Sequence, residues 1–92
     1  MPLHFQWDAA KAKANLRKHG VSFDEAASVF FDPLAVSGND PDHSTDESRF
    51  ITFGLSSRGR LLAIIHTVRG ESIRIISARR ATRTERKLYE EG

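Results

Sequence analysis

The sequence lacks cysteine and long apolar runs. No cysteine occurs among its 92 residues, so the chain can form neither a disulfide framework nor a thiolate zinc site. The longest apolar stretches, such as residues 61–65, are far too short to span a bilayer. The first residues also lack a charged start followed by a long apolar run, so no secretory signal is expected. We therefore expect a cytoplasmic protein without a membrane partner.

Metal ligands are sparse as well. The four histidines show neither HxH nor HxxxH spacing, patterns that place two imidazoles on one face of a strand or a helix. The acidic stretch at residues 38–48 lacks the glycine and glutamate placement of a calcium loop. We predict that the protein uses no metal and no other cofactor. At this length, residues 1–92 are expected to form a single domain with one modest core.

Charge is distributed unevenly along the chain. The net charge is only +2, yet residues 1–48 hold four Lys or Arg against eight Asp or Glu, and residues 49–92 hold ten against four. The basic half is suited to bind nucleic acid or an acidic protein. The alternative is that these charges only solvate the surface.

Local patterns predict the order of the elements. Asp8 can cap a helix that ends near Gly20, and Ser22 with Glu25 forms a capping box before a second helix. Helices are expected at 9–18, 22–30 and 82–91, and strands at 3–7, 34–37, 49–55, 60–69 and 72–79. Because consecutive hairpins give antiparallel pairing, we predict an α+β fold. Its antiparallel β-sheet would carry two N-terminal helices on one face and a C-terminal helix.

The last two strands are expected to form a hairpin with a loop at residues 70–71. This loop would place Thr67 opposite Arg74 and Ile65 opposite residue 76. His66 and Arg79 would then share the more apolar face, which is the better candidate for helix packing, and Arg74 would lie on the other face. A register shift of one residue would reverse the two faces.

The same hairpin is rich in arginine, whose planar guanidinium binds phosphate oxygens in pairs. Metal-free RNA cleavage needs a base, an acid and cations, because the neighbouring 2′-hydroxyl supplies the nucleophile. Histidine titrates near neutral pH and suits either proton-transfer role. The residues predicted to be catalytic are His66, Arg69, Arg74 and Arg79. The residues predicted to bind RNA are Lys11, Lys18, Arg49 and Arg80.

Each assignment has a structural alternative. A lone strand histidine such as His66 is often buried, and His19 can serve the end of a helix in place of proton transfer. Trp7 could stack on a base, although aromatic side chains of a terminal strand usually pack in the core. The helix positions 11, 15 and 18 are simply explained as a solvated face. Arg49 and Arg79 could instead pair with Glu25, Glu47 or Glu85.

Several motifs together resemble one family. They are Phe5-Gln-Trp-Asp8, Lys11, Asn15, Lys18-His-Gly-Val-Ser-Phe23 and Arg74-Ile-Ile-Ser-Ala-Arg79. The pattern is similar to that of the BrnT family, the toxins of type II toxin–antitoxin modules. The resemblance implies a RelE-like fold and a ribonuclease activity that blocks translation. It also implies a BrnA-like ribbon-helix-helix antitoxin, through which alone the complex would contact operator DNA.

Two other functions fit the residues without the resemblance. A nucleic-acid-binding module would use arginine for phosphates and aromatic rings for bases, without cleavage. A protein-interaction subunit would use the basic half for an acidic partner. RNA cleavage would indicate the ribonuclease, salt-dependent binding without cleavage the nucleic-acid-binding module, and copurification of a partner without nucleic-acid binding the protein-interaction subunit.

Overall fold

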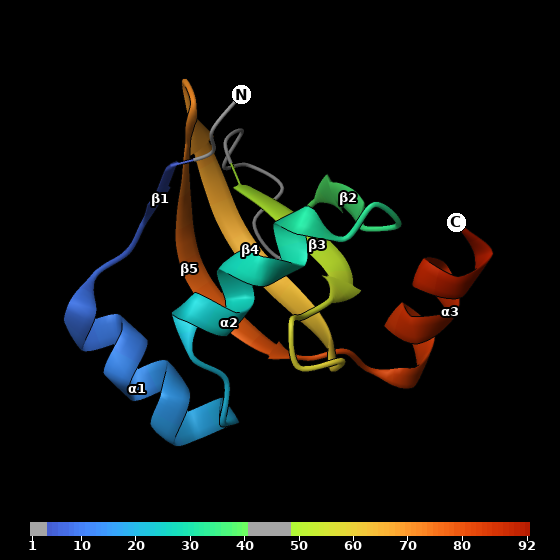
Figure 1. The fold of residues 1–92 in the computed structure, drawn as a ribbon, viewed down its shortest axis with the longest axis horizontal. Coiled ribbons are helices and arrows are strands. Elements are labelled where there is room, and N and C mark those ends of the chain that lie inside the picture. The colour runs from blue at the N-terminus through green and yellow to red at the C-terminus, as the bar shows by residue number, and fades with distance from the viewer. Residues whose placement is uncertain (1–3, 41–48) are drawn as a thin grey trace.

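The computed structural model describes residues 4–40 and 49–92. Its elements in chain order are β1 (His4–Gln6), α1 (Ala9–His19), α2 (Phe23–Ser28), the 3₁₀ turn η1 (Val29–Phe31), β2 (Val36–Asn39), β3 (Arg49–Leu55), β4 (Leu61–Arg69), β5 (Ser72–Arg80) and α3 (Arg83–Glu91) (Figure 1). The α+β class is confirmed. The predicted acidic loop lies largely at residues 41–48, outside the described residues.

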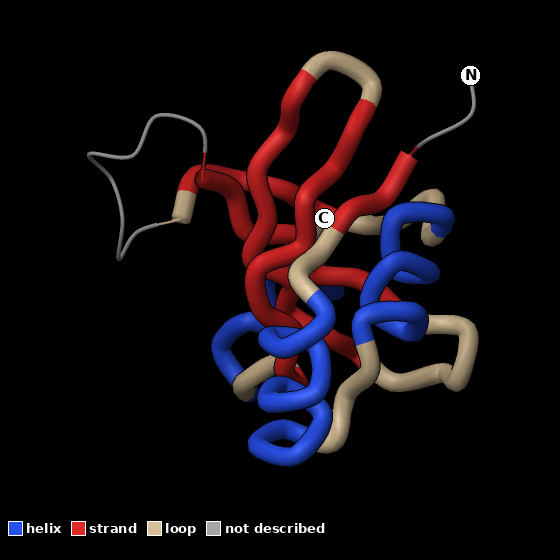
Figure 2. The backbone as a smooth tube through the Cα atoms, turned by 90° about the vertical axis from the view of Figure 1, so that its left-hand side faces the viewer, coloured by secondary structure: helices blue, strands red, loops and turns tan. Residues whose placement is uncertain are grey.

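The sheet has five strands in the order β1-β5-β4-β3-β2. The expectation of an antiparallel sheet is wrong for one strand, because β1 pairs with β5 in parallel and the sheet is mixed. Hairpin reasoning applies to strands that follow one another in the chain, as β3, β4 and β5 do. β1 instead pairs with the last strand in the chain. Figure 2 shows the β4–β5 hairpin extending beyond the helices.

The helix boundaries follow from local chemistry. Asp8 accepts a hydrogen bond from the Lys11 N–H at 3.0 Å and so begins α1, which Gly20 ends with a φ of 70°. Ser22 caps α2 by the same means. The helix α3 begins at a complete capping box formed by Thr82 and Glu85, which lies three positions later in the chain. The predicted caps at Asp8 and Ser22 are therefore present, but the capping box predicted at Ser22 is only half formed, because the Glu25 carboxylate binds Arg60 and Ser56 instead.

Two apolar clusters occupy opposite faces of the sheet. The larger joins α2 and η1 to β4 and β5, and its buried members are Val21, Phe23, Ala26, Val29, Leu62, Ile64, Ile73, Ile75 and Ala78. The smaller contains Ile51, Phe53 and Ala63, with Tyr89 of α3 packed against them. Gly54 allows the close approach of η1, since a Cβ there would lie 2.8 Å from Val29 Cγ1.

The β4–β5 hairpin contains a bulge that the sequence reasoning missed. His66 lies opposite Ile75, but the preceding residue, Ile65, lies opposite Ser77, so Ile76 is an extra residue on β5. The predicted pairing of Thr67 with position 74 is confirmed. The predicted pairing of Ile65 with position 76 is wrong.

The bulge reverses the faces of the second half of β5. Ala78 turns into the core and is fully buried. Arg79 moves to the face that carries Arg74, and Arg80 moves to the opposite one. We call the sheet face opposite α2 the arginine face, because it carries Arg49, Arg74 and Arg79. The expectation that Arg79 shares a face with His66 is wrong for this reason.

Candidate nucleic-acid interface

A row of polar residues crosses the arginine face. Gln6, Arg74, Thr67 and Arg49 are register partners on β1, β5, β4 and β3. Neighbouring strands lie about 4.8 Å apart, so one strand separates the two arginines by about 10 Å. Both arginine side chains are half-buried. The two arginines are therefore spaced to contact different phosphate groups of a nucleic-acid backbone and not a single one.

A shallow hollow adjoins this face, between α1 and the bulge of β5. Lys11, Lys18 and His19 line its helix side, and Ile76 and Ser77 line its strand side. We call this site the lysine hollow. Its volume is about 230 Å³. It brings together the two lysines that the sequence reasoning assigned to RNA, and it adds the imidazole at the end of α1.

The electrostatics of Asp8 link the lysine hollow to the arginine face. The pKa of Asp8 is lowered, first by the hydrogen bond from the backbone of Lys11 and further by the positive charges of Lys11 and Arg74. Asp8 therefore experiences the field of both cations. Lys11 and Arg74 therefore both lie close enough to Asp8 to favour its charged form.

Asn15 fixes the position of α1 against β5. Its Nδ2 donates to the carbonyls of Val21 at 3.0 Å and Ala78 at 2.8 Å, and its Oδ1 accepts from the Ala78 N–H at 3.2 Å. Asn15 is buried, so the expectation of a solvated helix face is wrong at this position. These hydrogen bonds pair the backbone N–H and carbonyl of Ala78, on the part of the β5 edge that β1 does not cover. Sequence spacing offers no signal for the contact with Ala78, because that residue is 63 positions away.

A second anchor holds the turn after α1. Arg60 donates through Nη2 to the Gly20 carbonyl at 3.0 Å and through Nε to Glu25 at 2.9 Å. Glu25 is buried and also accepts from Ser56 at 2.7 Å. Hydrogen bonds from Arg60 are the main reason that the pKa of Glu25 lies below its usual value. This network fixes the backbone next to His19.

His66 lies on the face opposite Arg74. Its ring is 5% exposed and lies between Phe30 and Phe50, with centroid distances of 4.8 and 5.9 Å. Its Nε2 is 2.7 Å from Thr52 Oγ1, and among the described residues its Nδ1 has no hydrogen-bond partner. Burial lowers the pKa of His66 to about 4. The structure therefore separates this imidazole from the arginine face.

The remaining predicted arginines lie in three different settings. Arg79 binds Glu85 of α3 with two hydrogen bonds of 2.7 and 2.9 Å, which also lower the pKa of that carboxyl. The predicted alternative, pairing of Arg79 with Glu85, is thus confirmed. Arg69 is exposed at the end of β4, and Arg80 is exposed at the end of β5.

Metal sites and membrane-spanning helices are both absent from residues 4–40 and 49–92. These residues contain no group of three or more His, Cys, Asp or Glu residues placed to hold a metal ion. Nor does any helix in these ranges have the length and apolar character needed to cross a membrane.

Comparisons with known proteins agree with this architecture. A family model described as "Ribonuclease toxin, BrnT, of type II toxin-antitoxin system" matches residues 7–85. The fold is similar to the crystal structure of the Brucella abortus ribonuclease toxin BrnT, with a TM-score of 0.70 and 21% sequence identity over 89% of this chain and 100% of that one. No curated protein matches the sequence. Because the family model matches most of the chain, the protein belongs to the BrnT family of ribonuclease toxins of type II toxin–antitoxin systems.

Proposed function

We propose that this protein is an endoribonuclease that cleaves RNA without a metal ion and thereby inhibits translation. The RNA backbone lies over the lysine hollow and continues along the arginine face. The observation that carries the proposal is a hollow lined by His19 and the cations Lys11 and Lys18, with a third cation, Arg74, two residues before the lining residue Ile76. Within the described part of the chain, no carboxylate forms an ion pair with these three cations. They are therefore available to an anionic ligand.

The chemistry follows from the side chains of the lysine hollow. The 2′-hydroxyl of the RNA attacks the adjacent phosphorus, and the bond to the 5′-oxygen breaks. The products are a 2′,3′-cyclic phosphate and a 5′-hydroxyl. His19 is the accessible group that can exchange a proton with the reacting oxygens. Lys11, Lys18 and Arg74 stabilise the negative charge that develops on the phosphorane.

The other predicted residues have supporting roles in this proposal. Arg49, Arg69 and Arg80 bind phosphates away from the scissile bond. Arg79 positions α3 through Glu85 and reaches RNA only when that ion pair opens. Proton transfer by His66 stays a prediction, and its burial with a pKa of about 4 favours a role in supporting β4.

Family membership supports a partner as well. We propose that a cognate, BrnA-like ribbon-helix-helix antitoxin neutralises this toxin and that operator DNA is contacted only through that antitoxin. Co-expression with the gene next to that of the toxin tests the pairing. A small protein that copurifies and suppresses cleavage supports the proposal, and unchanged cleavage in its presence contradicts it.

The cleavage test uses purified protein and total RNA in EDTA. Folded wild-type protein should cleave the RNA, and His19→Ala should lose most of this activity. Lys11→Ala should bind RNA more weakly, whereas the matched control Lys87→Ala on α3 should cleave normally. Intact RNA in EDTA with cleavage restored by Mg²⁺ would contradict metal independence. Salt-dependent binding without cleavage in either buffer would favour the non-catalytic binding module.

A further inference from the structure

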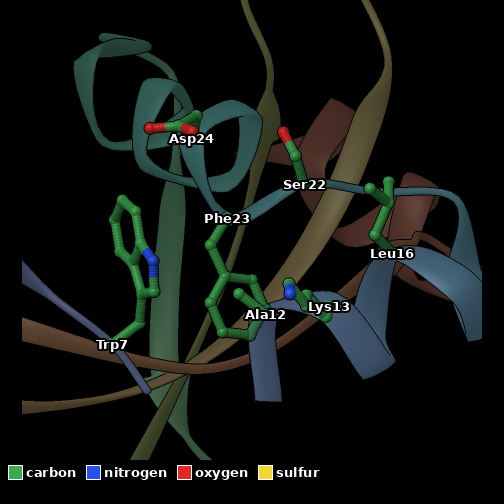
Figure 3. A pocket seen from close by; sticks show the side chains of 7 residues that line it. All are labelled: Trp7, Ala12, Lys13, Leu16, Ser22, Phe23 and Asp24. Carbon is green, nitrogen blue, oxygen red and sulfur yellow. The ribbon is translucent and has the colours of Figure 1, made fainter. Parts of the chain in front are cut away.

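A second hollow lies on another side of α1, away from the lysine hollow. Trp7, which follows β1, forms one wall, Ala12 and Leu16 of α1 form another, and Phe23 at the start of α2 lies between them (Figure 3). Its volume is about 190 Å³. We call this site the tryptophan hollow. Nothing in the proposed cleavage chemistry uses it.

The ring of Trp7 is held in place before any ligand binds. It meets Phe23 edge to face, with ring centroids 6.0 Å apart and ring planes at 81°. Phe23 is buried in the core, so it anchors the indole. Trp7 itself is only half-buried, and Leu16 is 51% exposed. The hollow thus presents a fixed aromatic ring beside an apolar wall that is open to solvent.

Polar groups at the edge of the hollow complement this apolar surface. Lys13 comes from α1 and Asp24 from the first turn of α2. Among the described residues, neither side chain forms an ion pair or a hydrogen bond. One edge therefore offers a cation and another offers two carboxylate oxygens as acceptors.

We propose that the tryptophan hollow binds one unpaired nucleobase of the RNA substrate, stacked against Trp7. Asp24 accepts hydrogen bonds from the base edge, and Lys13 binds the adjoining phosphate. A carboxylate favours bases that carry an exocyclic amino group, and guanine presents two N–H donors to it. Uracil offers a single N–H beside two carbonyls and binds less well. This inference rests on the proposed function, because it names a recognition element of the same RNA substrate.

The charge of α1 favours RNA over a protein side chain as the occupant. Between residues 9 and 19 the helix carries five Lys, Arg or His residues and no Asp or Glu. An RNA strand that crosses α1 can therefore contact the lysine hollow on one side and the tryptophan hollow on another. An aliphatic side chain would fill the apolar part but leave Lys13 and Asp24 without partners. Stacking on aromatic rings beside cations is the usual mode of single-stranded RNA binding.

The experiment uses the fact that Trp7 is the only tryptophan in the chain. Its fluorescence is followed during titration with uncleavable 2′-O-methyl oligonucleotides. Guanine-containing oligonucleotides should quench Trp7, and abasic oligonucleotides of equal length should bind about tenfold more weakly without quenching it. Asp24→Asn should remove the preference for guanine over uracil. Equal affinity and equal fluorescence for base-containing and abasic oligonucleotides would overturn the inference.

A matched pair of variants tests the site without removing its fluorophore. Leu16→Asp places a charge in the hollow, whereas Leu34→Asp places one on a residue that is 67% exposed and outside it. The first should reduce quenching and affinity about tenfold, and the second should leave both unchanged. Circular dichroism checks that each variant is folded. Equal RNA affinity in the two variants would contradict the assignment.

The outcomes separate this inference from the proposed function. RNA cleavage that depends on His19 without Trp7 quenching would refute the nucleobase site and leave the nuclease proposal intact. Quenching by guanine-containing oligonucleotides without cleavage would support the nucleobase site and refute the nuclease proposal. Quenching by a copurified antitoxin, with none by any oligonucleotide, would show that the hollow is a protein-binding surface and overturn the inference.

Discussion

Replacement of Asn15 by alanine tests how α1 is held against the sheet. The substitution removes three hydrogen bonds and leaves the N–H and carbonyl of the fully buried Ala78 without these partners. Each lost hydrogen bond costs about 1 kcal/mol, and an unpaired buried group adds about 1–3 kcal/mol. The higher helix propensity of alanine stabilises α1 by about 0.5 kcal/mol and offsets part of this loss. The free energy of unfolding should therefore fall by about 3.5–5.5 kcal/mol.

Urea denaturation followed by circular dichroism measures this change. The midpoint should move to lower urea with an unchanged slope, because the same surface is exposed on unfolding. Arg17→Ala is the matched control, since Arg17 is an exposed residue of the same helix. Its free energy of unfolding should change by less than about 0.5 kcal/mol. A loss below about 1 kcal/mol in Asn15→Ala would refute the reasoning.

Three further perturbations test other parts of the fold. Gly54→Ala should lower the free energy of unfolding, measured by urea denaturation, by about 1–3 kcal/mol, because its new Cβ would lie 2.8 Å from Val29 Cγ1. An unchanged free energy of unfolding would contradict the close packing. A change from pH 7 to pH 4 should lower the free energy of unfolding by roughly 3 kcal/mol through His66. The unfolded chain protonates this histidine near pH 6.5, whereas burial holds its pKa in the folded protein at about 4. An equal dependence of stability on pH in His66→Gln would contradict this. The pKa of Glu25 is lower in the folded protein than in the unfolded chain. Its ion pair with Arg60 therefore stabilises the fold fully above the pKa of the unfolded chain, and this stabilisation is lost as the pH falls through the pKa of the folded protein. Glu25→Gln should therefore lose stability at pH 7 and show a smaller further loss in acid, and an identical acid profile in both proteins would refute that role.

The features predictable from the sequence are those that depend on near neighbours. Asp8 and Ser22 cap helices through residues three positions away, and the turn at Gly70 places Arg69 opposite Ser72. The arginine-rich hairpin and the family motifs were also visible in the sequence. These signals sufficed for the α+β class and for the family.

The features that were missed depend on distant parts of the chain. The parallel pairing of β1 joins the two ends of the sequence, which no local pattern indicates. The extra residue Ile76 places Ala78 in the core and lets Asn15 bind its backbone. That single bulge moves Arg79 to the other face of the sheet. A register counted from the turn therefore places Arg79 on the wrong face. The RelE-like label stays a prediction.

His66 shows that residue type alone does not reveal whether a side chain is buried. Histidine in an arginine-rich hairpin suggests proton transfer, yet this ring lies between two phenylalanines on the helix-covered face. His19 does lie at the end of α1, and the structure also places it beside Lys11 and Lys18. Which of the two imidazoles is open to solvent depends on tertiary packing. Helix periodicity alone does not reveal it.

The most direct test of the lysine hollow as the catalytic site is the chemistry of the cleaved ends. A defined RNA is incubated in EDTA with wild-type protein, His19→Ala and His66→Gln, and the termini are identified by mass spectrometry. We expect 2′,3′-cyclic phosphate and 5′-hydroxyl ends from the wild-type protein and from His66→Gln, with little product from His19→Ala. Full activity of His19→Ala, or 5′-phosphate ends from the wild-type protein, would contradict cleavage in this hollow.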